Sequence, residues 1–304
     1  MKSILYIIIG LFFTISANGQ TLVQKHFNKG YNYLLLDKEI ALESFNKVIA
    51  ADSLYAPAYY YKGLINYKKG QYAECINIFN KALALDSTLD IIHMYKGFAY
   101  KQLENDSLAI ENFSKYIGRN PNAGGLEYTV RGKSKLANGD TKGALDDFST
   151  AANEQPTEQN HYYRFLVLFE NKKYSEAIKE INTTINFNSD FYGYYLHKGN
   201  TLFKLGKFKE AINTYSSAIK YNEAIADSYY LRGVTFDTIS MYNNAINDFT
   251  LAIKLNSADG TFYSKRGNSK YANGNKSGAC LDWTIAGKLG YYEDFERIKA
   301  LCEN

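Results

Sequence analysis

The three cysteines are the side chains best suited to covalent chemistry in this sequence. Cys280 lies eleven residues before Tyr291 and Cys302 lies eleven residues after it, so two antiparallel helices that turn near Tyr291 would bring the two thiols level. In an exported protein this spacing predicts a disulfide bond, which would contribute about 3 kcal/mol by closing the terminal loop. The alternative is a pair of buried thiols that fill space. Cys75 stands where similar segments carry alanine, and we expect it in the core.

Arginine and aspartate recur at a separation of sixteen residues. If the turn of an antiparallel helical hairpin lies midway between the two residues, they lie at the same height on facing helices. Their side chains can then form a charge-assisted hydrogen bond. Each pair would stabilise the fold by about 1 kcal/mol or less if it is exposed. The predicted structural ion pairs are Arg131 with Asp147, Arg232 with Asp248, and Arg266 with Asp282.

The remaining polar side chains give no catalytic or metal-binding pattern. The histidines His26, His93, His161 and His197 lack His-Glu-x-x-His spacing, and the cysteines lack Cys-x-x-Cys spacing. The sequence also lacks a nucleophile with a base at motif spacing and a phosphate-binding glycine loop. We therefore expect no metal, no cofactor and no enzymatic activity. The net charge is +4 without any basic run, so we do not expect nucleic acid as a partner.

These residues lie within a repeat whose clearest copy runs from Tyr195 to Ile219. The copy has the pattern of two short amphipathic helices joined by a turn. A large ring lies four residues before a central glycine, a small residue lies eleven or twelve after it, and a bulky residue follows four places later. Small and large side chains at fixed offsets let two helices pack closely, so each copy is predicted to be a helical hairpin. The central positions are Gly30, Gly63, Gly97, Gly132, Leu166, Gly199, Gly233 and Gly267, at intervals of 33 to 35 residues.

This pattern on a 34-residue period resembles the tetratricopeptide repeat (TPR) family, from about Val23 to the C-terminus. The resemblance implies an all-α fold, a right-handed superhelical solenoid of about eight helix-turn-helix units with a C-terminal capping helix. Leu166 replaces the glycine of the fifth unit, and the first and fifth units are each one residue short within the hairpin. Because a repeat array has no single core, we expect one continuous elongated domain over residues 20–290.

The two ends of the chain differ from the repeats. Residues 1–19 begin with a lysine, continue with an apolar run from Ile4 to Ile15 and end in small and polar residues, which predicts a secretory signal and a mature start at Gln20. The alternative is an uncleaved anchor. After cleavage we expect no integral membrane span. Residues 291–304 carry Phe295, Ile298 and Leu301 at helical spacing, which predicts a capping helix. The signal and the composition resemble those of exported Bacteroidota proteins.

The least regular connection between repeats runs from Arg119 to Gly125. It contains Pro121, one inserted residue and the pair Gly124 and Gly125. If the array has a hinge, we expect it there.

In proteins of the TPR family the first helix of each unit lines the inner wall of the superhelix, where peptides or helices of partners bind. Positions three before, one after and four after the central residue fall on one stripe of that helix. Exposed aromatic side chains on such a stripe would be anchors for a partner, although the alternative is that some of them pack between neighbouring units. The predicted groove residues are Tyr60, Leu64, Tyr67, Met94, Phe98, Lys101, Tyr163, Phe203 and Tyr230.

Taken together, the sequence predicts a non-enzymatic protein-interaction scaffold that binds a partner peptide or helix in the periplasm, at the cell envelope or outside the cell. Three alternatives remain. The chain could be a structural protein that associates with itself end to end, or its tyrosine-rich groove could stack sugar rings, with Tyr60 and Tyr67 as contacts. The third is an enzyme whose acids and bases gather only in the folded chain.

Overall fold

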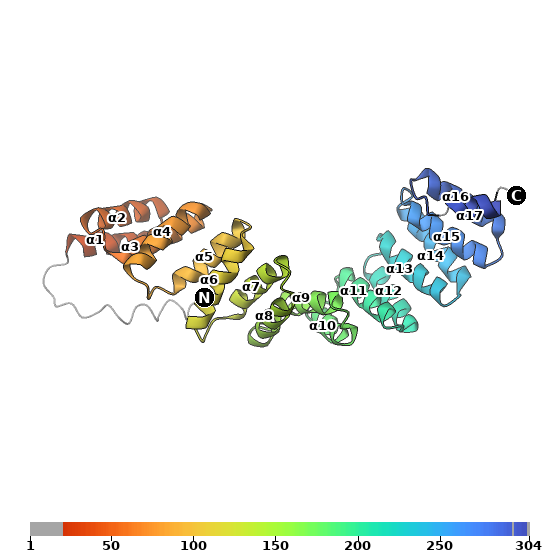
Figure 1. The fold of residues 1–304 in the computed structure, drawn as a ribbon, viewed down its shortest axis with the longest axis horizontal. Helices are drawn as coiled ribbons and strands as arrows, with labels where there is room; N and C mark the ends of the chain where they lie inside the picture. Colours follow the sequence, from red (N-terminus) through yellow and green to blue (C-terminus); the bar gives the residue numbers. More distant parts are fainter. Residues whose placement is uncertain (1–20, 294, 303–304) are drawn as a thin grey trace. The chain divides into compact units, whose positions relative to one another are not determined.

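The computed structural model of the chain describes residues 21–293 and 295–302, in which all regular secondary structure is α-helical (Figure 1). The predicted array of helical hairpins is confirmed. The predicted signal segment, residues 1–19, lies outside the described residues.

The helices form two compact units, which meet in the sequence at Ala123 and Gly124. Unit 1 contains three hairpins: α1 (Leu22–Tyr33) with α2 (Lys38–Ala51), α3 (Ala56–Lys68) with α4 (Tyr72–Leu85), and α5 (Ile91–Gln102) with α6 (Asp106–Arg119). Unit 2 contains five hairpins and a short last helix: α7 (Gly125–Ala137) with α8 (Thr141–Glu154), α9 (Glu158–Glu170) with α10 (Tyr174–Phe187), α11 (Tyr192–Lys204) with α12 (Phe208–Tyr221), α13 (Ala226–Thr238) with α14 (Tyr242–Leu255), α15 (Gly260–Ala272) with α16 (Lys276–Lys288), and α17 (Phe295–Cys302).

From the sequence we expect one continuous array over residues 20–290. The structure has two compact units instead, and their boundary lies within the segment predicted as a hinge. The physical reason is local. The connection after α6 contains Pro121 and Gly124, which continue neither helix. Gly125 is not a flexible residue, however, because it begins α7 and is buried. A Cβ atom there would lie 2.8 Å from Cβ of Gln155 and 3.0 Å from the carbonyl oxygen of Ala151.

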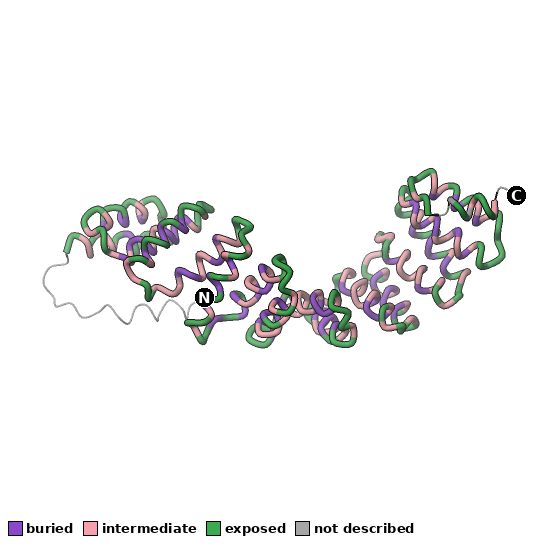
Figure 2. The backbone as a smooth tube through the Cα atoms, viewed as in Figure 1, coloured by how far each residue is buried: buried purple, intermediate pink, exposed green. Residues whose placement is uncertain are grey.

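Within a hairpin, the two helices are held together by the small and large positions of the repeat. The alanines of the second helix, such as Ala211, are fully buried, and a ring one turn later packs against the central glycine of the first helix. A Cβ atom at Gly199 would lie only 2.4 Å from Cε1 of Tyr215, so this approach requires glycine. Figure 2 shows buried residues along the helix surfaces that face one another in each unit.

The fifth hairpin has a different register from the one predicted. Lys172, in its turn, has the positive φ that Gly139 and Gly206 have in the neighbouring turns, each seven residues after the central position. The central residue is therefore Phe165 and not Leu166, and the hairpin is not short. Phe165 is fully buried against Ile181, which stands where other hairpins carry a ring. The large and small side chains have exchanged helices, so the volume between the helices stays filled.

The predicted capping helix begins later than expected. Gly290 has a φ of 87°, which ends the preceding helix, and residues 291–293 precede α17. Side chains of Ile298 and Leu301 in α17 are half-buried.

Candidate functional site

The three arginine and aspartate pairs predicted from the sequence lie in hydrogen-bond contact. In each, Nε and Nη2 of the arginine donate to the two carboxylate oxygens of the aspartate, at distances from 2.6 to 2.8 Å. The aspartates are buried, with exposed fractions from 1% to 4%, so these are internal bonds between the helices of one hairpin. Lys135 and Lys270 add a second cation to Asp147 and Asp282.

A fourth pair of this kind joins the helices of the fifth hairpin. Arg164 Nη2 donates to Oε1 of Glu180 at 2.6 Å, and Nδ1 of His161 lies 3.0 Å from Oε2 of the same carboxylate. Sequence reasoning missed this pair because the acid is a glutamate and because the register of the hairpin was one residue off. The sixteen-residue spacing from Arg164 to Glu180 would have revealed it.

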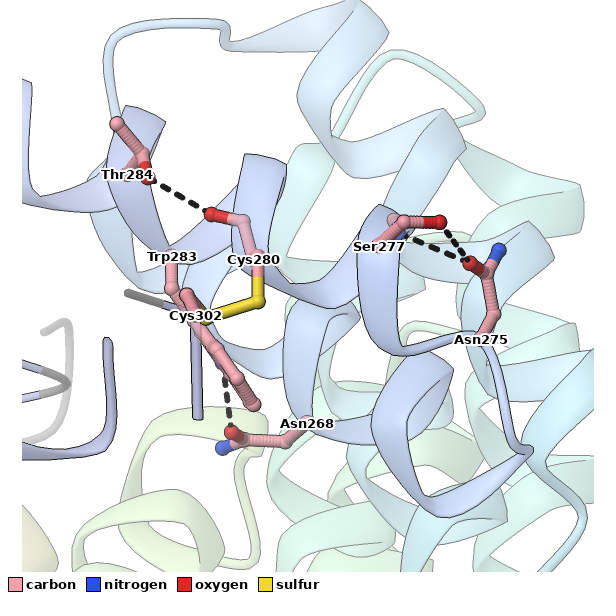
Figure 3. The surroundings of a disulfide bond; sticks show 8 residues. Asn268, Asn275, Ser277, Cys280, Trp283, Thr284 and Cys302 are labelled. Atoms are coloured by element: carbon pink, nitrogen blue, oxygen red, sulfur yellow. Dashed lines mark hydrogen bonds between the residues drawn. A yellow bond between two sulfur atoms is a disulfide. The ribbon is translucent and has the colours of Figure 1, made fainter. Parts of the chain in front are cut away.

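A disulfide bond joins Cys280 of α16 to Cys302 of α17 (Figure 3). It lies next to Trp283, whose side chain is fully buried and whose Nε1 donates to Oδ1 of Asn268 at 3.0 Å. The bond ties the short last helix to the eighth hairpin. Cys75, by contrast, is fully buried, and burial raises the pKa of its thiol to about 11. A thiol with that pKa carries little thiolate at neutral pH and is a poor nucleophile.

The first helices of successive hairpins contact one another side by side. In unit 1 the ring of Phe27 on α1 packs against Tyr61 on α3, and Tyr60 on α3 packs against Tyr95 on α5. In unit 2 the contacts continue from α7 through α9, α11 and α13 to α15. We call the outward surface of these first helices the first-helix wall: α1, α3 and α5 in unit 1, and α7, α9, α11, α13 and α15 in unit 2.

Two of the predicted groove residues are core residues. The exposed fractions of Tyr60 and Leu64 are only 9% and 6%. Tyr60 is enclosed by the rings of Tyr61, Phe79 and Tyr95, and burial raises the pKa of its hydroxyl far above the ordinary value. Because its ring is covered by three others, Tyr60 cannot serve as the sugar-stacking or partner-binding contact that we expected.

The other predicted groove residues lie half-buried on the first-helix wall. Phe98 contacts Phe113 edge to face, Phe203 contacts Phe208 in the same way, and Tyr230 packs against Phe249. Tyr230 packs in addition against Phe262 of the next hairpin. Each of the three rings is thus fixed by these contacts and still open in part to solvent. Lys101 is engaged within its hairpin, since its ammonium lies 2.6 Å from the carboxylate of Asp106. The remaining two of these residues are Tyr67 and Met94.

Tyr163 is half-buried as well, and it contacts the preceding hairpin. Its ring stacks on Phe148 of the preceding hairpin, as the ring of Tyr61 stacks on Phe45. Both tyrosines lie two residues before the central position once the fifth hairpin is correctly aligned. The residues of that hairpin that match the predicted stripe are Tyr162, Leu166 and Phe169.

Neither a metal-holding cluster nor a membrane-spanning helix is found in the part of the chain that the structure describes. No group of three or more histidine, cysteine, aspartate or glutamate side chains is arranged to hold a metal ion there. No described helix combines the length and the apolar character needed to cross a membrane.

Family models and solved structures both match this fold. A model described as TPR repeat matches residues 199–237, and two described as tetratricopeptide repeat match residues 56–89 and 226–259. The C-terminal part of a TPR repeat-containing protein from Cytophaga hutchinsonii has a TM-score of 0.66 at 15% identity, covering 80% of this chain and 98% of that chain. MamA has a TM-score of 0.52 at 20% identity, covering 57% of this chain and 94% of that chain.

A further MamA structure, from Desulfovibrio magneticus, has a TM-score of 0.52 at 18% identity and covers 56% of this chain and 97% of that chain. At these identities the likeness shows a shared fold. A search of curated proteins found no match.

Proposed function

This chain belongs to the tetratricopeptide repeat family, and we propose that it is a non-enzymatic scaffold that binds segments of partner proteins on its first-helix wall. Repeat arrays of this kind present continuous surfaces that suit extended or helical segments. The wall is the surface of this chain on which fixed aromatic rings recur from hairpin to hairpin.

The observation that carries the proposal is the half-burial of these rings. Phe98 and Phe203 are held by contacts with their own hairpins, and Tyr230 by its own hairpin and the next one, yet part of each ring is open to solvent. A ring that is already fixed loses little conformational entropy when a partner covers it, which makes it an efficient anchor.

We also propose that the chain acts after export, in the periplasm, at the cell envelope or outside the cell. The predicted signal segment over residues 1–19 motivates this proposal. The disulfide between Cys280 and Cys302 supports it, because disulfides persist in oxidising compartments.

The test is affinity capture from envelope and secreted extracts, with two matched variants. The first is Phe203→Ser with Tyr230→Ser on the wall. The second is Phe187→Ser with Tyr221→Ser, which removes two exposed rings from second helices. Both variants must keep the helical circular dichroism of the wild type.

We expect a partner that the wild type and the second variant capture equally and that the wall variant loses. Retention by the wall variant and loss by the second would place the binding surface on the second helices. If the chain captures only further copies of itself, and its sedimentation coefficient rises with concentration, the self-associating alternative is favoured.

A further inference from the structure

A pocket opens on the first-helix wall of unit 2, between α9 and α11. Its volume is about 410 Å³, and it is lined by Thr157, Glu158, Gln159, Tyr162, Tyr163 and Tyr194. Three aromatic rings and one carboxylate therefore meet at one place on the surface to which we assign partner binding.

The hydroxyls of Tyr162 and Tyr194 in this pocket are already engaged. The hydroxyl of Tyr162 lies 2.9 Å from Nε2 of His197, and the hydroxyl of Tyr194 donates to Oε1 of Glu158. Burial, together with the nearby Glu158, raises the pKa of Tyr194, and burial likewise raises the pKa of Tyr162, so both stay neutral at neutral pH. Tyr194 is buried, with an exposed fraction of 7%, and its ring packs against Phe191 and Tyr162, so its role here is to hold Glu158. Tyr162 is only half-buried, and what it offers to a ligand is the surface of its ring.

Glu158 differs from four buried acids that join the helices of a hairpin. Asp147, Glu180, Asp248 and Asp282 each pair with an arginine, whereas Glu158 has no cationic partner among the described residues. Its Oε1 accepts from Tyr194 and from Nδ2 of Asn188, the latter at 3.4 Å, and its Oε2 accepts no hydrogen bond within the described chain. Glu158 is half-buried in the first turn of α9, so its second carboxylate oxygen is available to a cationic ligand.

The rings of this pocket already receive a cation from within the chain. Nζ of Lys133 lies 4.7 Å from the centre of the Tyr163 ring. The electrostatic attraction between an ammonium and an aromatic face is the physical basis of this contact. The same ammonium also places a positive charge beside the pocket, which would oppose a second cation.

From these contacts we propose that the pocket takes a lysine or arginine side chain of the partner segment, an assignment that rests on the proposed scaffold function. The carboxylate of Glu158 would pair with the cationic head through its free oxygen. The half-buried ring of Tyr162 would cover the apolar stem and the face of the cation. A negatively charged side chain would be repelled by Glu158.

The experiment titrates the purified chain, labelled with ¹³C in its tyrosine rings, with single amino acid probes followed by NMR. The cationic probes are N-acetyl-lysine methylamide and N-acetyl-arginine methylamide. N-acetyl-norleucine methylamide is their neutral match, and N-acetyl-glutamate methylamide is the anionic one. We expect the cationic probes to shift the Tyr162 and Tyr194 signals with an affinity about tenfold higher than norleucine.

Two variants sharpen the test. Glu158→Gln keeps an oxygen that accepts from Tyr194 but removes the charge, and it should weaken the cationic probes about tenfold. Glu223→Gln, at an exposed acid of the α12–α13 loop, should leave them unchanged. Lys133→Gln should strengthen them, because it removes a like charge next to the pocket.

Equal binding of lysine and norleucine, tighter binding of glutamate, or an unchanged affinity in Glu158→Gln would each overturn the assignment. A partner protein captured equally by the wild type and by Glu158→Gln would also overturn it, while the scaffold function would stand. If the cationic probes bind as expected but no partner is captured, the pocket stands and the scaffold function fails.

Discussion

The central position of each hairpin shows how one side chain sets the distance between two helices. At Gly63 a Cβ atom would lie 2.5 Å from Cε1 of Phe79, closer than two such atoms can approach. Where Phe165 replaces this glycine, the opposing ring is replaced by Ile181. Both arrangements fill the space between the two helices. Packing therefore limits the combined volume of the two facing side chains, and glycine alone is not required.

Gly63→Ala is therefore expected to destabilise unit 1 by about 1–3 kcal/mol through overpacking. The double variant Gly63→Ala with Phe79→Leu should lose less stability than the two single variants together, by at least about 0.5 kcal/mol, because the two side chains occupy the same space. Gly118→Ala is the matched control, since nothing lies within 4 Å of a Cβ there. It should stabilise α6 by about 0.5–1 kcal/mol. Urea denaturation followed by circular dichroism measures all three, and additive effects at Gly63 and Phe79 would contradict the packing argument.

The buried aspartates make a second prediction at the residue scale. Asp147 and Asp282 each have a lysine beside them in addition to their arginine, whereas Arg232 is the only cation paired with Asp248 among the described residues. Arg232→Met should cost about 3 kcal/mol, because it leaves a buried carboxylate without a cation. Arg131→Met and Arg266→Met should each cost about 1 kcal/mol less, since a lysine remains. Urea denaturation would contradict this account if all three variants lost the same stability.

At the scale of the element, α17 is the clearest case of a helix held by a cross-link. It contains only eight residues, which is too short to be stable by itself. The disulfide closes a segment of 22 residues between Cys280 and Cys302. The covalent bond and the half-buried Ile298 and Leu301 together hold this helix against the eighth hairpin.

Reduction of this disulfide, or Cys302→Ser, should destabilise the C-terminal hairpin by about 3 kcal/mol. Trp283 reports the change, because it is the one tryptophan of the sequence and is fully buried in that hairpin. Its fluorescence should show unfolding at lower urea in the reduced protein than in the oxidised one. Cys75→Ala keeps the disulfide and should retain this difference. An unfolding midpoint that does not depend on reductant would show that the bond adds nothing.

On the scale of the whole molecule, the structure has two compact units where the sequence suggests one array. Each unit has its own buried alanines and rings, and each contains at least three hairpins, the number usually needed for a stable repeat array. We therefore expect residues 20–123 and residues 124–304 to fold when they are produced separately. Each should show helical circular dichroism and a cooperative thermal transition. A disordered fragment would mean that its hairpins depend on the other unit.

The repeat explains which features could be predicted from the sequence. Glycines, alanines and rings recur at fixed offsets, so each copy supports the same hairpin, and the arginine and aspartate pairs follow from that geometry. The burial of Tyr60 could not be predicted, because it depends in part on the ring of Tyr95, which belongs to the next hairpin. The pocket at Glu158 could not be predicted either, since Tyr194 lies 36 residues away and takes part in no repeated pattern.

The most direct test of partner binding on the first-helix wall is site-specific photo-crosslinking in intact cells. The photoreactive residue p-benzoylphenylalanine would replace Phe98, Phe203 or Tyr230 on the wall. The controls carry it in place of Asn80, Asn213 or Asn247, which are exposed on second helices. Our account predicts a crosslinked partner protein from wall positions in at least one unit and none from the controls. Crosslinks from the controls alone would contradict it.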